Sequence, residues 1–173
     1  ETIAVPVDAK TFAYTTKDVL NTVKNEHANF ALLINPDNPS GNFLEKKEIL
    51  ALCSDLKKVN CTLIFDESSS DFADPKVRYT LLDEDILANN DNLIVIKSIS
   101  KSYGVPGLRL GVLACGKDDF ISQIKRANAI WNINSFAEYF LQIYDKYNKT
   151  YKTACDSIAV ERERFSKELS KIK

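Results

Sequence analysis

Four short, continuous apolar runs limit the folds open to this chain more than any other feature. They are FALLI at residues 30–34, TLIF at 62–65, LIVI at 93–96 and LGVLA at 110–114. Because their apolar residues are consecutive and do not alternate with polar ones, the runs are typical of strands covered on both faces, as in a parallel sheet. The sequence therefore predicts an α/β fold, a three-layer sandwich in which helices cover a mostly parallel sheet.

The segments between these runs predict the remaining elements. Residues 45–59 carry apolar side chains at helical spacing, which predicts a strand–helix–strand unit with a right-handed crossover. The opening TIAVPV at residues 2–7 predicts a further strand, which is either irregular or at an edge of the sheet because Pro6 has no N–H to donate. After residue 116 the chain contains neither Gly nor Pro, so we expect helices over residues 118–128 and onward from residue 135.

Charge, cysteine and histidine content argue against several classes of function. Lys and Arg number 23 against 24 for Asp and Glu, so the net charge of -1 gives no electrostatic reason to expect nucleic acid or an anionic membrane as a partner. The four cysteines have neither CxxC spacing nor the density of a disulfide scaffold, and we expect reduced thiols in a cytoplasmic protein. His27 is the only histidine and has no cluster of possible ligands near it, so no metal site is expected.

Each of the first three apolar runs is followed at once by a cluster of polar residues. NPDNPSG at 35–41 follows the first run, DESSSD at 66–71 follows the second, and KSISK at 97–101 follows the third. In open parallel sheets, ligands bind outside the carboxyl ends of the strands, where neighbouring loops converge. We therefore predict that the three clusters line one pocket.

Taken singly, each cluster also has a purely structural interpretation. NPDNPSG is rich in turn formers and could be no more than a loop that leads into the next helix. Asp66 could cap a helix or form half of a buried ion pair. Lys101 could be one of many solvated cations, and Arg109 could pair with a carboxylate. Only the combination indicates a function.

The clusters, continued as SISKSYGVPGLRLG at residues 98–111, resemble the large domain of the class I and II aminotransferases, which have fold type I. In particular, they are similar to the histidinol-phosphate aminotransferase branch, which also contains threonine-phosphate decarboxylase. The resemblance covers residue 3 to the C-terminus and implies pyridoxal 5'-phosphate as the cofactor. Family members are about twice as long, and this chain has no Met. We therefore expect residues 1–173 to be a partial large domain without the N-terminal segment and the small C-terminal domain.

Two residues match the catalytic positions of that family. Lys101 matches the lysine whose uncharged amine forms a Schiff base with the cofactor aldehyde and, once released, serves as a general base. Asp66 matches the carboxylate that keeps the pyridine nitrogen protonated, which makes the ring an electron sink. The resemblance implies that both also bind the cofactor.

Further positions match cofactor-binding residues of the family. Asn38 matches the amide that donates to the 3'-oxygen of the ring, Ser98 and Ser100 match hydroxyls near the phosphate, and Arg109 matches the guanidinium that grips the phosphate through a forked contact. Ser69 stands where the family commonly has an aromatic residue, often a tyrosine that binds the 3'-oxygen. Because serine is shorter, we expect Ser69 to lie behind the direct ligands.

The resemblance implies transamination between an amino acid, or an amine derived from one, and a 2-oxo acid or aldehyde. It also implies a homodimer when the protein is complete. One alternative is a decarboxylase of the threonine-phosphate type that uses the same cofactor. Another is a truncated, non-catalytic fragment that associates through the aromatic helical stretch at residues 136–151.

Overall fold

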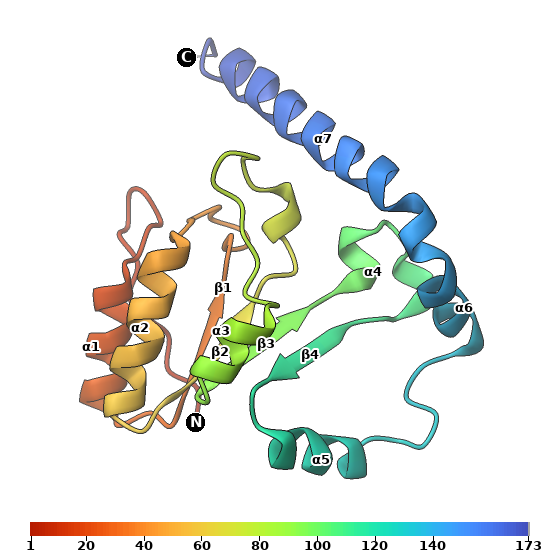
Figure 1. Ribbon diagram of the computed structural model, residues 1–173. Helices are drawn as coiled ribbons and strands as arrows, with labels where there is room; N and C mark the ends of the chain where they lie inside the picture. Colours follow the sequence, from red (N-terminus) through yellow and green to blue (C-terminus); the bar gives the residue numbers. More distant parts are fainter. Residues whose placement is uncertain (173) are drawn as a thin grey trace.

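The computed structural model describes residues 1–172, and the elements that carry the fold follow one another along the chain as Figure 1 shows. In order they are α1 (Thr16–Glu26), β1 (Phe30–Ile34), α2 (Lys46–Lys58), β2 (Thr62–Asp66), the 3-10 turn η1 (Ser70–Phe72), α3 (Glu84–Asn89), β3 (Leu93–Lys97), α4 (Ile99–Ser102), the 3-10 turn η2 (Pro106–Leu108), β4 (Val112–Cys115), α5 (Asp118–Ala127), α6 (Ser135–Ile143), the 3-10 turn η3 (Tyr144–Tyr147) and α7 (Asn148–Leu169).

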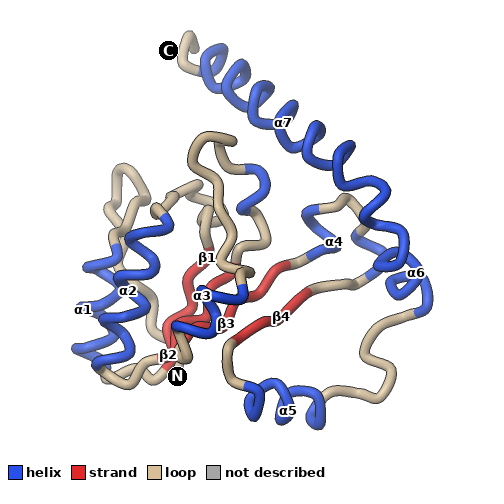
Figure 2. The backbone as a smooth tube through the Cα atoms, viewed as in Figure 1, coloured by secondary structure: helices blue, strands red, loops and turns tan. Residues whose placement is uncertain are grey.

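The four strands form one sheet in the order β1-β2-β3-β4, drawn in red in Figure 2. The first three are parallel, with Ile34 opposite Asp66 and Asp66 opposite Ile96, so their carboxyl ends are aligned. The fourth strand runs antiparallel to β3 and pairs Lys97 with Val112. The predicted mostly parallel sheet with helices is therefore confirmed. The last strand begins at Val112, two residues later than its apolar run.

Two helices cover one face of the sheet and form the core with it. The predicted helix at 45–59 is confirmed as α2, and it packs beside α1 (Figure 1). Ile49 and Leu56 of α2 and Leu63 of β2 are fully buried in this core. Burial of each such side chain stabilises the fold by roughly 1.5–3 kcal/mol. The start of α1 is fixed by a capping box between Thr15 and Asp18.

The first strand departs from the expectation that both faces of every strand are covered. On β1 the buried residues Ala31 and Leu33 alternate with Phe30 and Leu32, which are 62% and 63% exposed. Within residues 1–172, one face of β1 is thus packed against helices and the other lies at the surface. A continuous apolar run in the sequence does not show whether one face of a strand or both faces are buried.

The prediction of a strand at residues 2–7 is wrong. The segment forms no strand, and the chain turns back after it in a loop closed by hydrogen bonds from Phe12 N–H to Asp8 O and from Asp8 N–H to Ala13 O. Pro6 removes one of the few donors that a short strand could use. Ile3 and Val7 remain 44% and 48% exposed. Burial of these side chains therefore does not compensate for the absent hydrogen bonds between strands.

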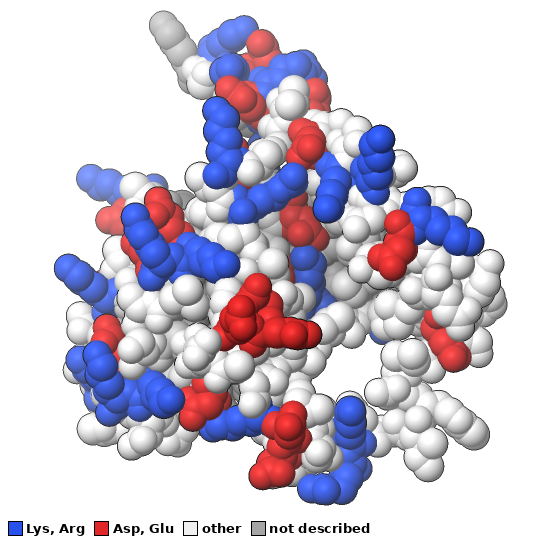
Figure 3. Space-filling view, in the orientation of Figure 1, with Lys and Arg blue, Asp and Glu red and all other residues white. Residues whose placement is uncertain are grey.

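The last third of the chain is helical, as predicted, but it is divided into separate pieces. The helix expected at 118–128 is α5, and the chain then becomes irregular before α6, whose N-cap is Asn134 with its side-chain oxygen accepting from Ala137 N–H at 3.0 Å. The turn η3 separates α6 from α7. Lys, Arg, Asp and Glu side chains are interspersed along the surface of α7 (Figure 3). No helix within residues 1–172 has the length and apolar character needed to cross a membrane.

Candidate active site

A cavity of about 420 Å³ opens at the carboxyl ends of β2 and β3. Most of the site residues predicted from the sequence line it, namely Asp66, Ser98, Ser100, Lys101 and Arg109. They come from three separate segments that converge because β2 and β3 are parallel neighbours and end at the same edge.

Asp66 is the last residue of β2 and is half-buried at the cavity wall. Its Oδ1 accepts a hydrogen bond from the backbone N–H of Ser68 at 2.8 Å. This contact holds the carboxylate close to its own backbone, as in an Asx turn, and prevents it from rotating freely. The second carboxylate oxygen remains able to accept from a ligand in the cavity.

Lys101 lies on the one-turn helix α4, which follows β3 directly. Ser98 caps this helix, with its Oγ accepting from Lys101 N–H at 3.4 Å. The Oγ of the buried Ser100 accepts from Leu110 N–H at 2.7 Å, and Ser102 Oγ donates to Ser98 O at 3.0 Å. The small hydroxyl residues around Lys101 therefore hold its backbone in place. The hydroxyls of Ser98 and Ser100 each accept one bond in these contacts and can still donate a proton to a ligand.

Arg109 follows η2 in the left-handed region, with φ of 52°. A non-glycine residue adopts this conformation at a cost of roughly 1–2 kcal/mol, and such strain is concentrated at functional sites. The side chain is exposed and donates to Pro106 O at 3.3 Å. Two residues on, a Cβ at Gly111 would lie 3.3 Å from Lys97 O, so glycine permits the chain to pass close to the end of β3.

A second lysine in the cavity is a feature that the sequence interpretation missed. Lys97 is the last residue of β3, its side chain is 10% exposed, and its Nζ lies 2.8 Å from Asp71 Oδ2 and 3.9 Å from Glu67 Oε1. Within the described part of the chain, no ion pair involves Lys101. The two cavity lysines thus differ: Lys97 is nearly buried and paired with carboxylates, whereas Lys101 is an exposed residue of the lining. Glu67 and Asp71 of DESSSD were the sequence signal from which a paired lysine in this cavity could have been predicted.

Glu67 is fully buried and is the innermost residue of this ion-pair cluster. Burial raises the pKa of its carboxyl group, while hydrogen bonds from Thr80 Oγ1 at 2.6 Å and Leu81 N–H at 2.8 Å, and the charge of Lys97, act in the opposite direction. A buried carboxylate of this kind stays stable only while its partners remain in place.

Asn38 and Ser69 lie outside the cavity lining, and no residue of the cluster at 35–41 belongs to it, so the prediction that all three polar clusters line one pocket is wrong for the first cluster. Asn38 is exposed in the loop at residues 35–41, which is closed by its own bonds, such as Gly41 N–H to Asp37 O at 2.9 Å. Ser69 lines a different, largely apolar cavity of about 360 Å³, together with Phe72. Their assignments as cofactor ligands stay predictions.

The donor set of the main cavity fits a phosphorylated pyridine. A guanidinium and hydroxyls with free protons, from Arg109, Ser98 and Ser100, suit an anionic phosphate. The carboxylate of Asp66 suits a protonated ring nitrogen, and the amine of Lys101 suits an aldehyde. The phosphate, the ring nitrogen and the aldehyde of pyridoxal 5'-phosphate thus each have a chemical partner among the lining residues.

Comparisons with known proteins agree with this chemistry. The family model "Aminotransferase class I and II" matches residues 1–173. An L-serine phosphate decarboxylase of Campylobacter jejuni is 35% identical over 161 residues, which are 89% of this chain and 40% of the relative. A histidinol-phosphate aminotransferase of Clostridium novyi is 28% identical over 161 residues, which are 93% of this chain and 42% of the relative.

Among solved structures, a decarboxylase from Sulfurospirillum multivorans superposes with a TM-score of 0.82 at 29% identity, covering 97% of this chain and 48% of that one. The chain thus spans less than half the length of each of these relatives. The resemblance drawn from the three polar clusters is confirmed. This chain belongs to the class I and II aminotransferase family, whose members depend on pyridoxal 5'-phosphate.

Proposed function

We propose that the cavity at the ends of β2 and β3 binds pyridoxal 5'-phosphate in an enzyme that acts at the α-carbon of an amino acid. The observation that carries the proposal is the convergence of Lys101, Asp66 and Arg109 on one cavity. The bound cofactor supplies an aldehyde that reacts with amines and a ring that accepts electrons from the substrate α-carbon. The residues of this chain provide binding, orientation and proton transfer.

Lys101 is assigned two roles. Its amine would hold the cofactor covalently through the aldehyde and would give way to the amino group of the substrate. Once displaced, it removes or returns a proton at the substrate α-carbon as a general base or acid. Its exposure to the cavity and the hydrogen bonds that hold α4 support both roles.

The other residues hold the cofactor in one orientation. Asp66 keeps a proton on the ring nitrogen, so the negative charge that develops in the transition state is stabilised. Arg109, with the hydroxyls of Ser98 and Ser100, binds the phosphate. Asn38 is assigned to the 3'-oxygen by the family resemblance alone.

Transamination is the first candidate reaction. In it, Lys101 would move a proton from the α-carbon to the C4' carbon of the cofactor, the amino donor would leave as a 2-oxo acid, and a second 2-oxo acid or an aldehyde would accept the amino group. We further propose that the complete protein is a cytoplasmic homodimer, as is typical of the family.

Decarboxylation of a phosphorylated amino acid is the second candidate, and a specific observation favours it. The identity to the L-serine phosphate decarboxylase, 35%, exceeds the 28% to the histidinol-phosphate aminotransferase, and a decarboxylase superposes with a TM-score of 0.82. In this reaction the bond from the α-carbon to the carboxylate breaks, carbon dioxide leaves, and Lys101 returns a proton to the α-carbon.

A covalent labelling experiment tests the cofactor site. Full-length wild type is incubated with pyridoxal 5'-phosphate, reduced with borohydride and digested, and the labelled peptide is located by mass spectrometry. We expect the label on Lys101 and its loss in Lys101→Ala. Lys97→Arg is the matched control because it keeps the paired cation of the same cavity, and it should label as wild type does. Equal labelling of the Lys101→Ala variant would refute the proposal.

Product analysis separates the two reactions. Full-length protein loaded with cofactor is supplied with O-phosphoserine or histidinol phosphate, with and without a 2-oxo acid. Release of carbon dioxide without any 2-oxo acid requirement identifies decarboxylation. Transfer of the amino group to the 2-oxo acid, with no carbon dioxide, identifies transamination.

A further inference from the structure

One residue of α7 reaches back toward the cavity. Tyr151 Oη donates a hydrogen bond to Asp71 Oδ2 at 2.7 Å, and its ring stacks on Tyr103 with a centroid distance of 3.9 Å and an interplanar angle of 17°. Elsewhere on α7, only Cys155 and Ala159 are buried. Beyond these residues the helix extends away from the sheet (Figure 1), and its further contacts include the ion pair of Asp156 with Arg78 at 2.7 Å and a hydrogen bond from Arg162 to Phe72 O.

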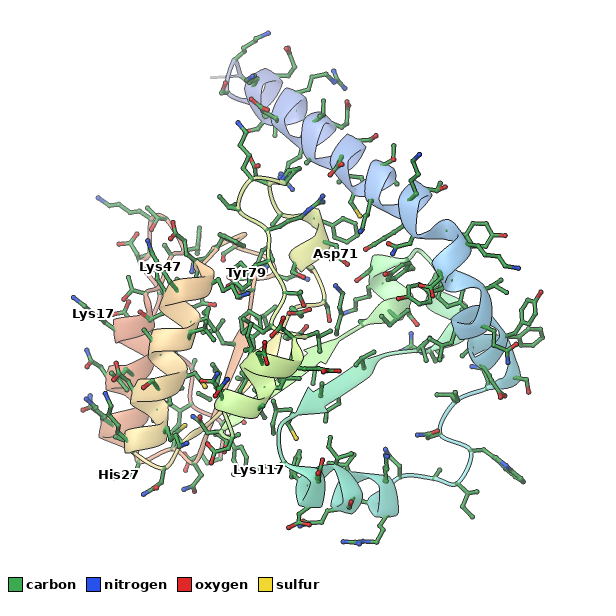
Figure 4. All side chains as sticks on the ribbon, viewed as in Figure 1. Lys17, His27, Lys47, Asp71, Tyr79 and Lys117 are labelled. Atoms are coloured by element: carbon green, nitrogen blue, oxygen red, sulfur yellow. The ribbon has the colours of Figure 1, made fainter. Side chains whose placement is uncertain are left out.

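Asp71 is shared between this helix and the cavity. It accepts from Tyr151 through Oδ2 and from Lys97 Nζ through Oδ1 at 2.9 Å, and Lys97 lines the cavity. Asp71 belongs to η1, and in Figure 4 its label stands on the side of η1 that is toward α4 and α7. Burial and the neighbouring negative charge of Asp71 raise the pKa of Tyr151. The phenol therefore stays protonated and continues to donate to Asp71 at neutral pH.

The ring on which Tyr151 stacks lies at the end of the helix that carries Lys101. Tyr103 is the C-cap of α4 and comes two residues after Lys101. Offset stacking of two aromatic rings adds roughly 0.5–1.5 kcal/mol beyond the area that they bury. Through one side chain, α7 thus touches the carboxylate that pairs with Lys97 and the end of the helix that carries Lys101.

We propose that Tyr151 is a positioning residue that couples the docking of α7 to occupancy of the cavity. This inference rests on the proposed cofactor site. A cofactor held by Lys101 and Ser100 would restrict α4, and with it the Tyr103 ring on which Tyr151 stacks, and it would fill the cavity beside Lys97, the partner of Asp71. Because coupling between two sites is reciprocal, cofactor binding must stabilise docked α7 by the same factor by which docked α7 strengthens cofactor binding.

The test is amide hydrogen exchange of full-length protein with and without pyridoxal 5'-phosphate. Tyr151→Phe removes only the hydroxyl and keeps the ring that stacks on Tyr103. Tyr147→Phe is the matched control because Tyr147 is 57% exposed and precedes α7 by one residue. We expect the cofactor to slow exchange over residues 148–160 in wild type and in Tyr147→Phe, and to do so far less in Tyr151→Phe. The apparent affinity of Tyr151→Phe for the cofactor should fall on the order of 5- to 10-fold.

The outcomes separate this inference from the cofactor site itself. If visible absorbance shows cofactor bound to wild type but α7 exchange does not change, the coupling is refuted while the cofactor site stands. Equal protection of α7 in Tyr151→Phe and wild type also refutes it. Exchange over α2 serves as an internal reference, because a general loss of stability would accelerate both helices. Failure of wild type to take up any cofactor would overturn the cofactor site and this inference together.

Discussion

The hydroxyl oxygen of Ser68 accepts a hydrogen bond from the backbone N–H of Ser98 at 2.8 Å. Ser68 also donates its own N–H to Asp66 and accepts, at its carbonyl, from Ser102 Oγ at 2.9 Å. A single buried serine therefore joins the end of β2 to both ends of the helix that carries Lys101. The separation between the Asp66 carboxylate and the Lys101 backbone depends on this link.

Ser68→Ala should reduce both stability and cofactor affinity. The substitution removes the acceptor of a partly buried N–H, which costs roughly 1–3 kcal/mol in the free energy of unfolding, and it loosens the link between Asp66 and α4. Urea unfolding and a titration with pyridoxal 5'-phosphate measure the two effects. Ser70→Ala is the control, since Ser70 is buried and donates to Glu67 O but lines no part of the cavity. The control should lose stability and keep its affinity.

Asp66→Asn should abolish most of the activity without unfolding the protein. The amide oxygen can still accept from Ser68 N–H, so the melting temperature should change little. Loss of the charge that keeps the ring nitrogen protonated should lower kcat by about 10²–10³-fold, as for other groups that stabilise developing charge. A kcat equal to that of wild type would contradict the role assigned to Asp66.

Glu67 should make stability fall as pH rises. Its pKa in the folded protein is raised above the ordinary value of 4.5, so the unfolded chain loses this proton first and the folded state binds more protons above about pH 4.5. The contribution of Glu67 to the free energy of unfolding is therefore largest at low pH and declines as pH rises through its folded pKa. The difference in unfolding free energy between wild type and Glu67→Gln, measured by urea titration from pH 4.5 to 7, should become less favourable to wild type with increasing pH.

Thiol labelling should distinguish the cysteines by burial. Cys53, Cys61 and Cys155 are buried, and burial raises the pKa of Cys53 to about 11. Because the thiolate is the reactive form, Cys53 should resist iodoacetamide in the native protein at pH 8. Cys115 is only partly buried and should be alkylated first. Mass spectrometry after brief labelling, compared with labelling in urea, measures the order in which the cysteines are alkylated. Modification of Cys53 before Cys115 would contradict the burial of Cys53 in the core.

Local pattern in the sequence predicted most of the strands and helices and the sheet edge at which five candidate site residues meet. The apolar runs at 30–34, 62–65 and 93–96 became parallel strands, and the helical spacing in 45–59 became α2. Because parallel neighbours end at one edge, the clusters after β2 and β3 had to meet there, and five predicted residues line the resulting cavity. These features follow from periodicity and chain direction, which are encoded over short distances.

Tertiary packing alone decided the rest. The antiparallel direction of β4, the open face of β1 and the irregular path of residues 2–7 depend on which surfaces neighbouring segments cover. The carboxylate of Asp71 meets Lys97 across 26 positions and Tyr151 across 80. No local spacing encodes such contacts, because they form only when the ends of β2 and β3 and the start of α7 are brought together. The same packing determined that Lys97 is a paired, nearly buried cation while Lys101 is an exposed residue of the cavity lining.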